Sequence, residues 1–250
     1  MSKITSKQHT MWGLANPKRF MDFSAVLLPW VCLLAGVLLV VGFYWSLFVA
    51  PPDYQQGESV RIMFVHVPAA WMSLFVYGLI AVASFVGLVF AHPLADVAAK
   101  AAAPFGAAFT ALALITGSLW GKPMWGTYWV WDARLTSELV LLFIYFGYIA
   151  LWSAIEDPAR AGRAAAILAL VGAVDLPIIH FSVDWWRNTL HQPASVMRFG
   201  GPTMDSSYLW PLGIMALGYT VLFLWLWLIR MRTEIWQRRL RSILLQRSAN

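Results

Sequence analysis

Six long apolar runs divide this chain, and they constrain its fold more than any other feature. They cover residues 23–50, 67–91, 101–119, 135–155, 164–183 and 208–229. Each is close to or above the roughly 20 residues that a helix needs to cross the hydrocarbon core of a bilayer. Backbone polar groups find no water there, so a run of this length must satisfy them internally as a helix. We therefore expect an all-α membrane protein, with residues 1–250 forming a single domain built on a six-transmembrane-helix bundle.

Composition supports this class. Charged residues make up 12% of the chain and hydrophobic residues 60%, whereas soluble domains carry about 25% charged residues. The net charge of +6 comes from residues that flank the runs, which indicates a lipid bilayer as partner and no nucleic acid. Cys32, the single cysteine, excludes an intrachain disulfide, a CxxC metal site and a CxxCH haem-attachment site. The polar N-terminal arm predicts no cleavable signal peptide.

The distribution of Lys and Arg predicts the orientation. With six spans, thirteen of these residues lie on the side that holds both termini and five lie on the other side. The positive-inside rule then places both termini in the cytoplasm and the three longer loops outside. Residues 230–250 form a basic cytoplasmic tail, whose apolar positions from Ile235 to Leu244 share one face. This pattern is typical of a helix that lies on the inner leaflet.

The second outward loop, residues 120–135, is the most distinctive stretch. It contains the sequence WGKPMWGTYWVWDAR, with four indoles, one phenol and two glycines. Membrane proteins place aromatic girdles at the interface, which is one interpretation. Four indoles in a glycine-hinged loop exceed what a girdle needs, and flat rings with a polar N–H suit a large planar ligand. The residues of this platform are Trp120, Gly121, Trp125, Gly126, Tyr128, Trp129, Trp131 and Asp132.

Two histidines, His66 and His191, lie in the outward loops on either side of the Trp-rich stretch. A lone interfacial histidine is usually structural, but a pair beside an aromatic platform also fits haem, whose iron accepts axial imidazoles. The propionates of haem would require cations. Cationic residues on the same side are Arg61, Lys122, Arg134 and Arg187.

Three ionisable residues lie within the apolar runs: Glu138, Asp175 and His180. Such residues are costly in hydrocarbon and raise a functional hypothesis. Glu138 is placed to orient the loop, for instance by pairing with Arg134 one turn earlier. Asp175 and His180 indicate either a polar contact between helices or a proton or ion relay. G-x-S-x-G, H-E-x-x-H and Walker A patterns are absent, so we expect no enzyme and no ATP hydrolysis by this chain.

The stretch WGKPMWGTYWVWDARLTSE resembles the signature of the tryptophan-rich (WWD) haem-handling family of cytochrome c maturation. Together with RIMFVHVPAAW, DWWRNTLHQP and the six-span length, it is similar to the branch known as haem exporter protein C, or CcmC. The resemblance covers residues 18–230. It implies a multi-pass protein of the bacterial inner membrane that presents haem in the periplasm and transfers it to a periplasmic haem chaperone in c-type cytochrome biogenesis.

The resemblance also implies a cofactor and partners. Non-covalent haem b would be held by His66 and His191 as axial ligands, over the signature residues. The implied partners are the haem chaperone, a small one-span membrane protein, and the membrane subunit and cytoplasmic ATPase of an ABC-type complex. Two other functions stay open: a permease subunit that exports haem or another substrate, and an ion or proton carrier that uses Asp175 and His180.

Overall fold

The computed structural model describes residues 16–186, 191, 196–198, 201–202 and 204–249. Six helical segments in these ranges are long and apolar enough to span a membrane, which confirms the predicted all-α, six-helix class. In chain order the elements are α2 (Pro17–Tyr44), η2 (Trp45–Val49, π), η3 (Glu58–Ile62, 3-10), α3 (Met63–Phe90), α4 (Ala95–Trp125), α5 (Ala133–Ala154), α6 (Pro158–Gly172), α7 (Asp175–Trp185), β1 (Met197–Arg198), β2 (Gly201–Pro202) and α8 (Ser206–Ala249).

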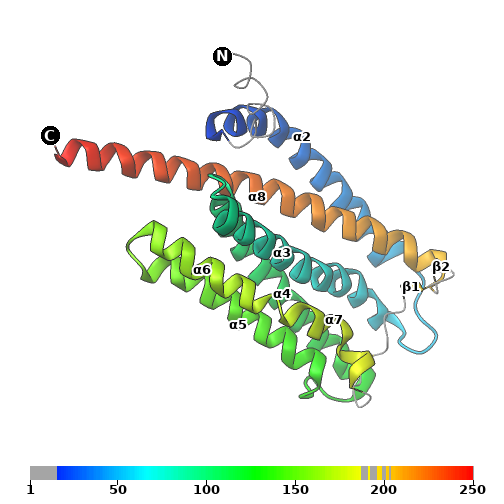
Figure 1. The fold of residues 1–250 in the computed structure, drawn as a ribbon. Helices are drawn as coiled ribbons and strands as arrows, with labels where there is room; N and C mark the ends of the chain where they lie inside the picture. The colour runs from blue at the N-terminus through cyan, green and yellow to red at the C-terminus, as the bar shows by residue number, and fades with distance from the viewer. Residues whose placement is uncertain (1–15, 187–190, 192–195, 199–200, 203, 250) are drawn as a thin grey trace, which may run out of the picture.

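Helices α3 and α4 form the centre of the bundle. Figure 1 shows α2 beside α8 on one side of them, and α5 with the α6–α7 pair on the other. The most apolar window of α4 is 44% buried, against 17% for α2. The Ala- and Gly-rich α4 is therefore the most enclosed of the six spans in the described residues. A Cβ at Gly106 of α4 would overlap the Tyr145 ring of α5, so this glycine permits close helix contact.

Two helices are longer than the apolar runs predict. Helix α4 continues to Trp125 and ends where Gly126 adopts a left-handed backbone with φ of 78°. Residues 120–125, which we expected in the Trp-rich loop, are therefore helical. Residues 230–249, predicted as a separate interfacial helix, instead continue α8 without a break. Apolar periodicity does not detect such extensions, because a helix leaving the bilayer stays helical when no residue stops it.

The fifth span is broken into α6 and α7 around Ala173 and Val174. Asp175, which we expected in mid-span, is the first residue of α7. Pro177 then falls in the first helical turn, where its missing N–H costs no hydrogen bond. Gly172 lies against Tyr77, and a Cβ at this position would overlap the tyrosine hydroxyl. The break therefore sits at a tight contact between α6 and α3.

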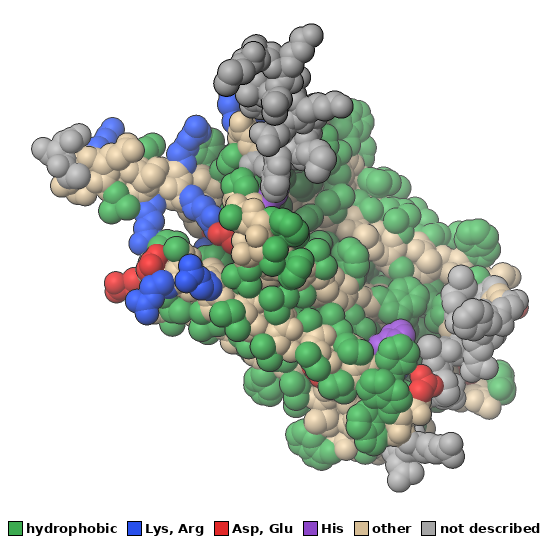
Figure 2. All heavy atoms as spheres, in the orientation of Figure 1, with side chains coloured by type: hydrophobic (Ala, Val, Ile, Leu, Met, Phe, Trp, Pro, Cys, Tyr) green, Lys and Arg blue, Asp and Glu red, His purple; other side chains and the backbone are tan. Residues whose placement is uncertain are grey.

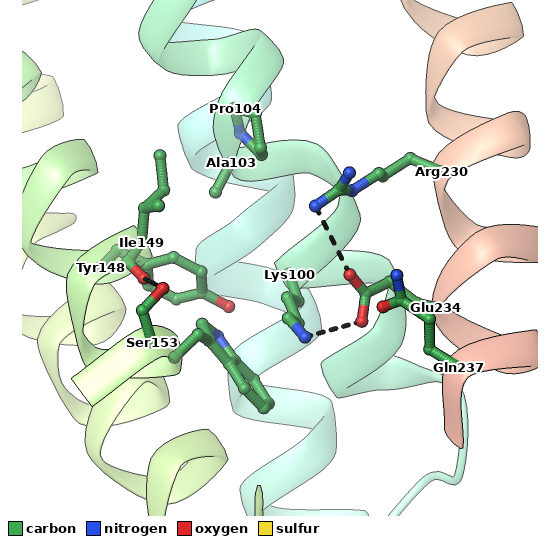
Figure 3. Close-up of a pocket in the computed structure, with 10 residues that line it drawn as sticks. Lys100, Ala103, Pro104, Tyr148, Ile149, Ser153, Arg230, Glu234 and Gln237 are labelled. Carbon is green, nitrogen blue, oxygen red and sulfur yellow. Dashed lines mark hydrogen bonds and ion pairs between the residues drawn. The ribbon is translucent and has the colours of Figure 1, made fainter. Parts of the chain in front are cut away.

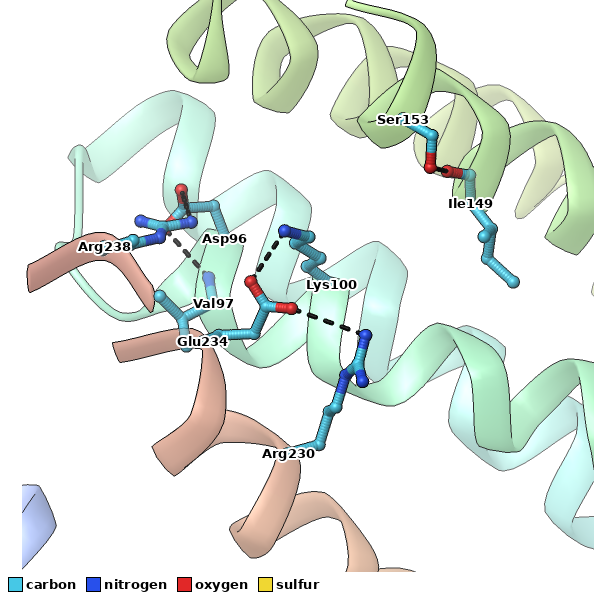
Figure 4. Close-up of polar contacts among 8 residues, drawn as sticks. All are labelled: Asp96, Val97, Lys100, Ile149, Ser153, Arg230, Glu234 and Arg238. Atoms are coloured by element: carbon cyan, nitrogen blue, oxygen red, sulfur yellow. Dashed lines mark hydrogen bonds and ion pairs between the residues drawn. The ribbon is translucent and has the colours of Figure 1, made fainter. Parts of the chain in front are cut away.

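One end of the bundle carries a group of ion pairs, and we call it the ionic end. Glu234 of α8 is buried and accepts hydrogen bonds from Lys100 of α4 at 2.7 Å, while Arg230 lies 3.6 Å away (Figure 4). Arg238 pairs with Asp96 at 2.8 Å. Figure 2 shows blue and red side chains gathered at this end, beside a largely green surface. Only Glu234 is deeply buried, so removing Lys100 would leave a buried carboxylate without its closest cation, which typically costs about 3–5 kcal/mol. The Arg238–Asp96 pair is partly exposed and contributes little to stability, but it joins the same two helices.

Candidate functional site

The opposite end carries the predicted histidines and tryptophans, and we call it the aromatic end. His66 lies in the first turns of α3, Trp120 and Trp125 in the last turns of α4, and Asp132 at the start of α5. His191 comes from the segment between α7 and α8 and lies against Asp132. Residues from four parts of the chain therefore meet at one end of the bundle.

The protein itself orients the ring of His66. Its Nδ1 lies 2.9 Å from the carbonyl oxygen of Ala113 and 3.1 Å from the Thr116 hydroxyl, both on α4. The Thr116 hydroxyl already donates to Leu112. A carbonyl oxygen only accepts hydrogen bonds, so Nδ1 carries the proton of the neutral ring. The lone pair is then on Nε2, the atom available to a metal ion.

His191 is oriented in the same way by a carboxylate. Its Nδ1 lies 2.9 Å from Oδ2 of Asp132, whose side chain is 2% exposed. The other carboxylate oxygen, Oδ1, accepts from the Leu135 backbone N–H at 2.8 Å and caps α5. A carboxylate that holds Nδ1–H leaves the lone pair on Nε2 and is a common support for histidine ligands of metals.

Each histidine also lies against one tryptophan of α4. His66 meets Trp120 edge to face with ring centroids 5.7 Å apart, and His191 meets Trp125 with centroids 4.8 Å apart. The indole N–H of Trp120 donates to Gln56 at 3.0 Å. Charge interactions also connect His66 with His191 and Arg134, which places all three in one region. The two predicted ligand residues are therefore close and similarly supported.

Glycine at position 117 is required for the position of His66. A Cβ at Gly117 would lie 2.9 Å from Cε1 and 3.4 Å from Nδ1 of the imidazole. Contacts below 3.0 Å do not occur between real Cβ atoms and their neighbours. The absence of a side chain on this face of α4 therefore makes room for the ring.

The remaining platform residues divide between the interior and the surface. Trp129 is half-buried and packs edge to face on Trp131 at 5.4 Å, and its buried Nε1 has no hydrogen-bond partner among the described residues. Trp131 is 75% exposed and Tyr128 57%. A buried indole N–H that lacks an acceptor costs free energy unless a ligand or a water supplies one. The platform therefore has one unsatisfied donor inside and two aromatic rings outside.

The predicted cationic residues have different partners. Lys122 donates to the Gly126 carbonyl at 3.0 Å and lies over the Tyr128 ring. Arg134 donates to the His180 carbonyl and the Ser182 hydroxyl, and it connects α5 with α7. Arg61 pairs with Glu58 and donates to the Ser46 carbonyl at 2.9 Å. Arg61 thus serves to hold the end of the first span. Arg187 lies outside the described residues.

The predicted pairing of Glu138 with Arg134 is wrong in the described part of the chain. Glu138 is buried and accepts from the Ser73 hydroxyl at 2.7 Å, whose carbonyl in turn accepts from Tyr145. Asp175 has a buried Oδ2 without a hydrogen bond among the described residues. His180 is exposed on α7 and packs on Phe181. No hydrogen bond or ion pair therefore joins Asp175 and His180 in the described part of the chain.

Several supporting residues were not found from the sequence. Ala113 contributes only a backbone carbonyl, and no sequence pattern identifies such a role. Gln56 follows Asp53, whose carboxylate accepts from the backbone N–H groups of residues 55 and 56. Gly57, with φ of 55°, completes this turn. An Asp-x-x-x-Gly turn signal is visible in the sequence, but its partner Trp120 is 64 residues away.

Asp132 is the ionisable group whose surroundings matter most here. Burial raises its pKa, but the hydrogen bonds from His191 and Leu135 outweigh burial, so the pKa lies below its ordinary value. A lowered pKa means that the ionised carboxylate stabilises the fold above the unfolded-state pKa of about 3.9. This contribution disappears as the pH falls through the lower folded-state pKa.

We therefore expect Asp132→Ala to lower the free energy of unfolding by about 0.5–2 kcal/mol at neutral pH, because the α5 cap is lost. Asp132→Asn should lose less, since asparagine also caps helices. Thermal unfolding of both variants measures the difference. The gap in unfolding free energy between wild type and Asp132→Asn should narrow as the pH falls from the unfolded-state pKa of about 3.9 through the lower folded-state pKa, where the carboxylate protonates. A gap that is independent of pH would contradict this assignment.

The fold and this end together define a class: a multi-pass helical membrane protein that presents two oriented histidines on an aromatic surface. The model of the family "Heme exporter protein C" matches residues 10–246, so the chain belongs to this family. It is similar to Heme exporter protein C of Bradyrhizobium diazoefficiens, with 62% identity over 94% of this chain and 88% of that protein. Identity to the Escherichia coli K12 protein is 52% over 90% and 91%, and to that of Paracoccus denitrificans 46% over 94% and 97%.

Proposed function

We propose that this protein binds haem at the aromatic end and transfers it to a periplasmic haem chaperone during c-type cytochrome maturation. The observation that carries the proposal is the matched orientation of His66 and His191. In both rings a protein oxygen holds Nδ1, which leaves Nε2 as the nitrogen that a metal ion would bind. Two imidazoles held in this way on one aromatic surface suit the axial positions of haem iron. The family name is consistent with this cargo.

The other residues of the aromatic end suit the rest of the haem molecule. Trp120 and Trp125 keep the two imidazoles in place by edge contacts. The unsatisfied Trp129 N–H can donate to a propionate, and Arg134 and Lys122 supply positive charge nearby. The single cysteine, Cys32, is in α2 and cannot provide a CxxCH attachment site. Haem b held without a covalent bond therefore fits these residues best.

The exposed aromatic rings are suited to contact a partner protein during haem transfer. Trp131 and Tyr128 extend from the platform, and Trp185 and Trp186 at the end of α7 are 57% and 49% exposed. Exposed aromatic residues are enriched where proteins dock, and they add little to the stability of the free protein. We infer that this rim contacts the chaperone while the histidines hold the cargo.

The proposed partners are those that the family resemblance implies. Transport energy would come from the membrane subunit and ATPase of an ABC-type complex, with a small one-span protein as a further subunit. A permease or ion-carrier function would need a polar path through the bundle, but Glu138 is held by Ser73, and His180 is exposed on α7. Binding and transfer without enzyme catalysis is therefore the favoured function.

Transfer should depend on Trp131. In a mixture of haem-loaded protein and haem-free chaperone, Trp131→Ala should slow the appearance of haem on the chaperone about tenfold, in line with the loss of a docking hot spot. Haem binding by the variant itself should stay normal, because Trp131 points outward. Trp236→Ala, which removes an exposed indole from the ionic end, is the matched control. Equal transfer rates for both variants would exclude the rim from docking.

The proposal requires the aromatic end to face the periplasm of an inner-membrane protein. In a Cys32→Ser background, Tyr54→Cys and Ser206→Cys should react with an impermeant thiol reagent added to whole cells with a permeable outer membrane. Ala159→Cys, at the ionic end, should react only after the inner membrane is opened. All three positions are exposed. Labelling of Ala159→Cys in intact cells would reverse the predicted orientation.

A further inference from the structure

The ionic end contains a cavity, at the opposite end of the helices from His66 and His191. It has a volume of about 470 Å³, within the range of small-molecule sites. Its walls come from the end of α3, the start of α4, the end of α5, the start of α6 and the tail of α8. No residue of the aromatic end lines it. The chemistry of a ligand must therefore be inferred from the residues that line the cavity.

The inner part of this cavity contains more hydrogen-bond donors than acceptor oxygens. Ser84 is 3% exposed, and neither its Oγ nor the buried Nε1 of Trp152 has a hydrogen-bond partner among the described residues. The hydroxyl of Tyr148 lies close to both groups, and its oxygen can accept a hydrogen bond from either of them. Buried polar groups are nearly always paired, and three donors that share two hydroxyl oxygens leave one donor for a ligand that carries acceptor oxygens.

The mouth of the cavity is positively charged. Arg163 and His92 line it, together with Arg238, which is paired with Asp96. Arg163 forms no ion pair with any residue that the structure describes. Among the described residues, Asp96 is the one carboxylate that lines the cavity, and it is paired with Arg238. Arg163 therefore favours an anion, and phosphate and carboxylate groups fit its planar donor set.

The outer wall is apolar and open towards the surface of the bundle. Leu88 lines the cavity, is 39% exposed, and continues into the exposed side chains of Phe85 and Val89 on α3. In a membrane protein this surface of α3 faces lipid. A ligand with hydrocarbon chains can therefore extend from the cavity along α3.

A smaller cavity of about 180 Å³ on the other side of Tyr148 and Trp152 is a poorer candidate. Lys100 and Arg230 both point to the Glu234 carboxylate in it, and these charges satisfy one another (Figure 3). Lys100 also lies over the Trp152 ring, 5.0 Å from its centroid. These ion pairs stabilise the wall of Tyr148 and Trp152 that the two cavities share. A ligand with acceptor oxygens is therefore better suited to the larger cavity.

We propose that the larger cavity binds one anionic glycerophospholipid from the adjacent leaflet. The phosphate lies at Arg163 and Arg238. An ester carbonyl oxygen accepts from the donor that Ser84, Tyr148 and Trp152 leave unpaired among themselves, and the acyl chains follow α3 past Leu88. Haem fits less well, because His92 is the one histidine in the described part of the chain that lines this cavity, whereas the aromatic end offers an oriented pair. Free phosphate would fill only the mouth and leave the inner donor unsatisfied.

Such a lipid connects the elements that form the ionic end. It contacts the α3–α4 connection through His92, the α5–α6 hairpin through Trp152 and Arg163, and α8 through Arg238. We expect it to stabilise the intact bundle, because a ligand that binds only the folded state raises the unfolding temperature.

The test uses the whole protein purified in detergent. Native mass spectrometry should find one retained phosphatidylglycerol. Added phosphatidylglycerol should raise the unfolding temperature by at least about 3 °C. Phosphatidylcholine and inorganic phosphate should have no comparable effect. An equal shift with inorganic phosphate would show an anion site without lipid selectivity, and an equal shift with phosphatidylcholine would show general lipid solvation. Either result would overturn the proposal.

Matched variants locate the site. Arg163→Gln should weaken phosphatidylglycerol binding about tenfold or more, through the loss of a charged hydrogen bond. Arg160→Gln, in the same exposed turn but outside the cavity, should bind as wild type. Trp152→Phe keeps an aromatic side chain but removes the indole N–H together with its five-membered ring, and it should reduce lipid retention without loss of folded protein. Retention that is unchanged in both Arg163→Gln and Trp152→Phe would place any bound lipid elsewhere.

Discussion

Purified protein that carries both His66→Ala and His191→Ala should retain at most about one hundredth of the haem bound by wild type. Disturbing even a supporting contact of a ligand typically weakens metal affinity 10–100-fold, and the double variant removes both iron ligands. Each single variant should keep part of the haem with shifted absorption bands, because one imidazole remains. Absorption spectra and haem content per protein measure these effects.

His92→Ala and His180→Ala are the controls for this experiment. His92 is at the ionic end, and His180 is exposed on α7 and packs on Phe181. Each control removes one histidine, as His66→Ala and His191→Ala do, but it should leave the haem spectrum unchanged. Wild-type spectra for His66→Ala and for His191→Ala would remove these residues as axial ligands and leave the proposed site without its iron contacts.

Gly117→Ala should separate haem affinity from protein stability. The added methyl would lie 2.9 Å from Cε1 of His66, so the ring must turn and its hydrogen bond to Ala113 must lengthen. We expect haem affinity to fall about 10–100-fold, as for loss of a supporting contact. The helix itself prefers alanine to glycine by up to about 1 kcal/mol, so the folded protein should persist.

Haem titration measures the affinity, and thermal unfolding of the same preparations measures the stability. Gly36→Ala is the matched control, because nothing lies within 4 Å of a Cβ at that position. It should bind haem as wild type does. If Gly117→Ala also binds haem normally, the exact position of the His66 ring does not determine affinity.

The spans and the shared side of the two histidines could be predicted because both depend on local properties. Apolar runs longer than a bilayer is thick identify helices, and an even number of spans between two loops returns the chain to the same side. The same reasoning placed Trp120 in a loop. It is helical because helix ends depend on the residue that stops them, here Gly126, rather than on the apolar limit of the membrane.

The side-chain partners could not be predicted because they join residues that are distant in sequence. Asp132 and His191 are separated by 59 positions, and His66 and Ala113 by 47. The local rule for helical pairs favoured Arg134 as partner of Glu138, but α7 offers Arg134 a carbonyl and a hydroxyl. Ser73 offers Glu138 a neutral donor inside the bundle. Packing between helices thus overrides spacing within one.

The continuous helix α8 gives the molecule a mechanical property. Its 44 residues correspond to a rod of about 66 Å, whose first turn contacts Pro52 through Tyr208 and whose later turns are fixed to α4 through Glu234. A rod that pivots where Lys100 holds Glu234 behaves as a lever. A tilt of about 5° at this point would move the first turn of α8, about 40 Å away, by about 3 Å. Force applied at the ionic end would thus displace the loop that begins at Pro52, next to the turn that holds Gln56.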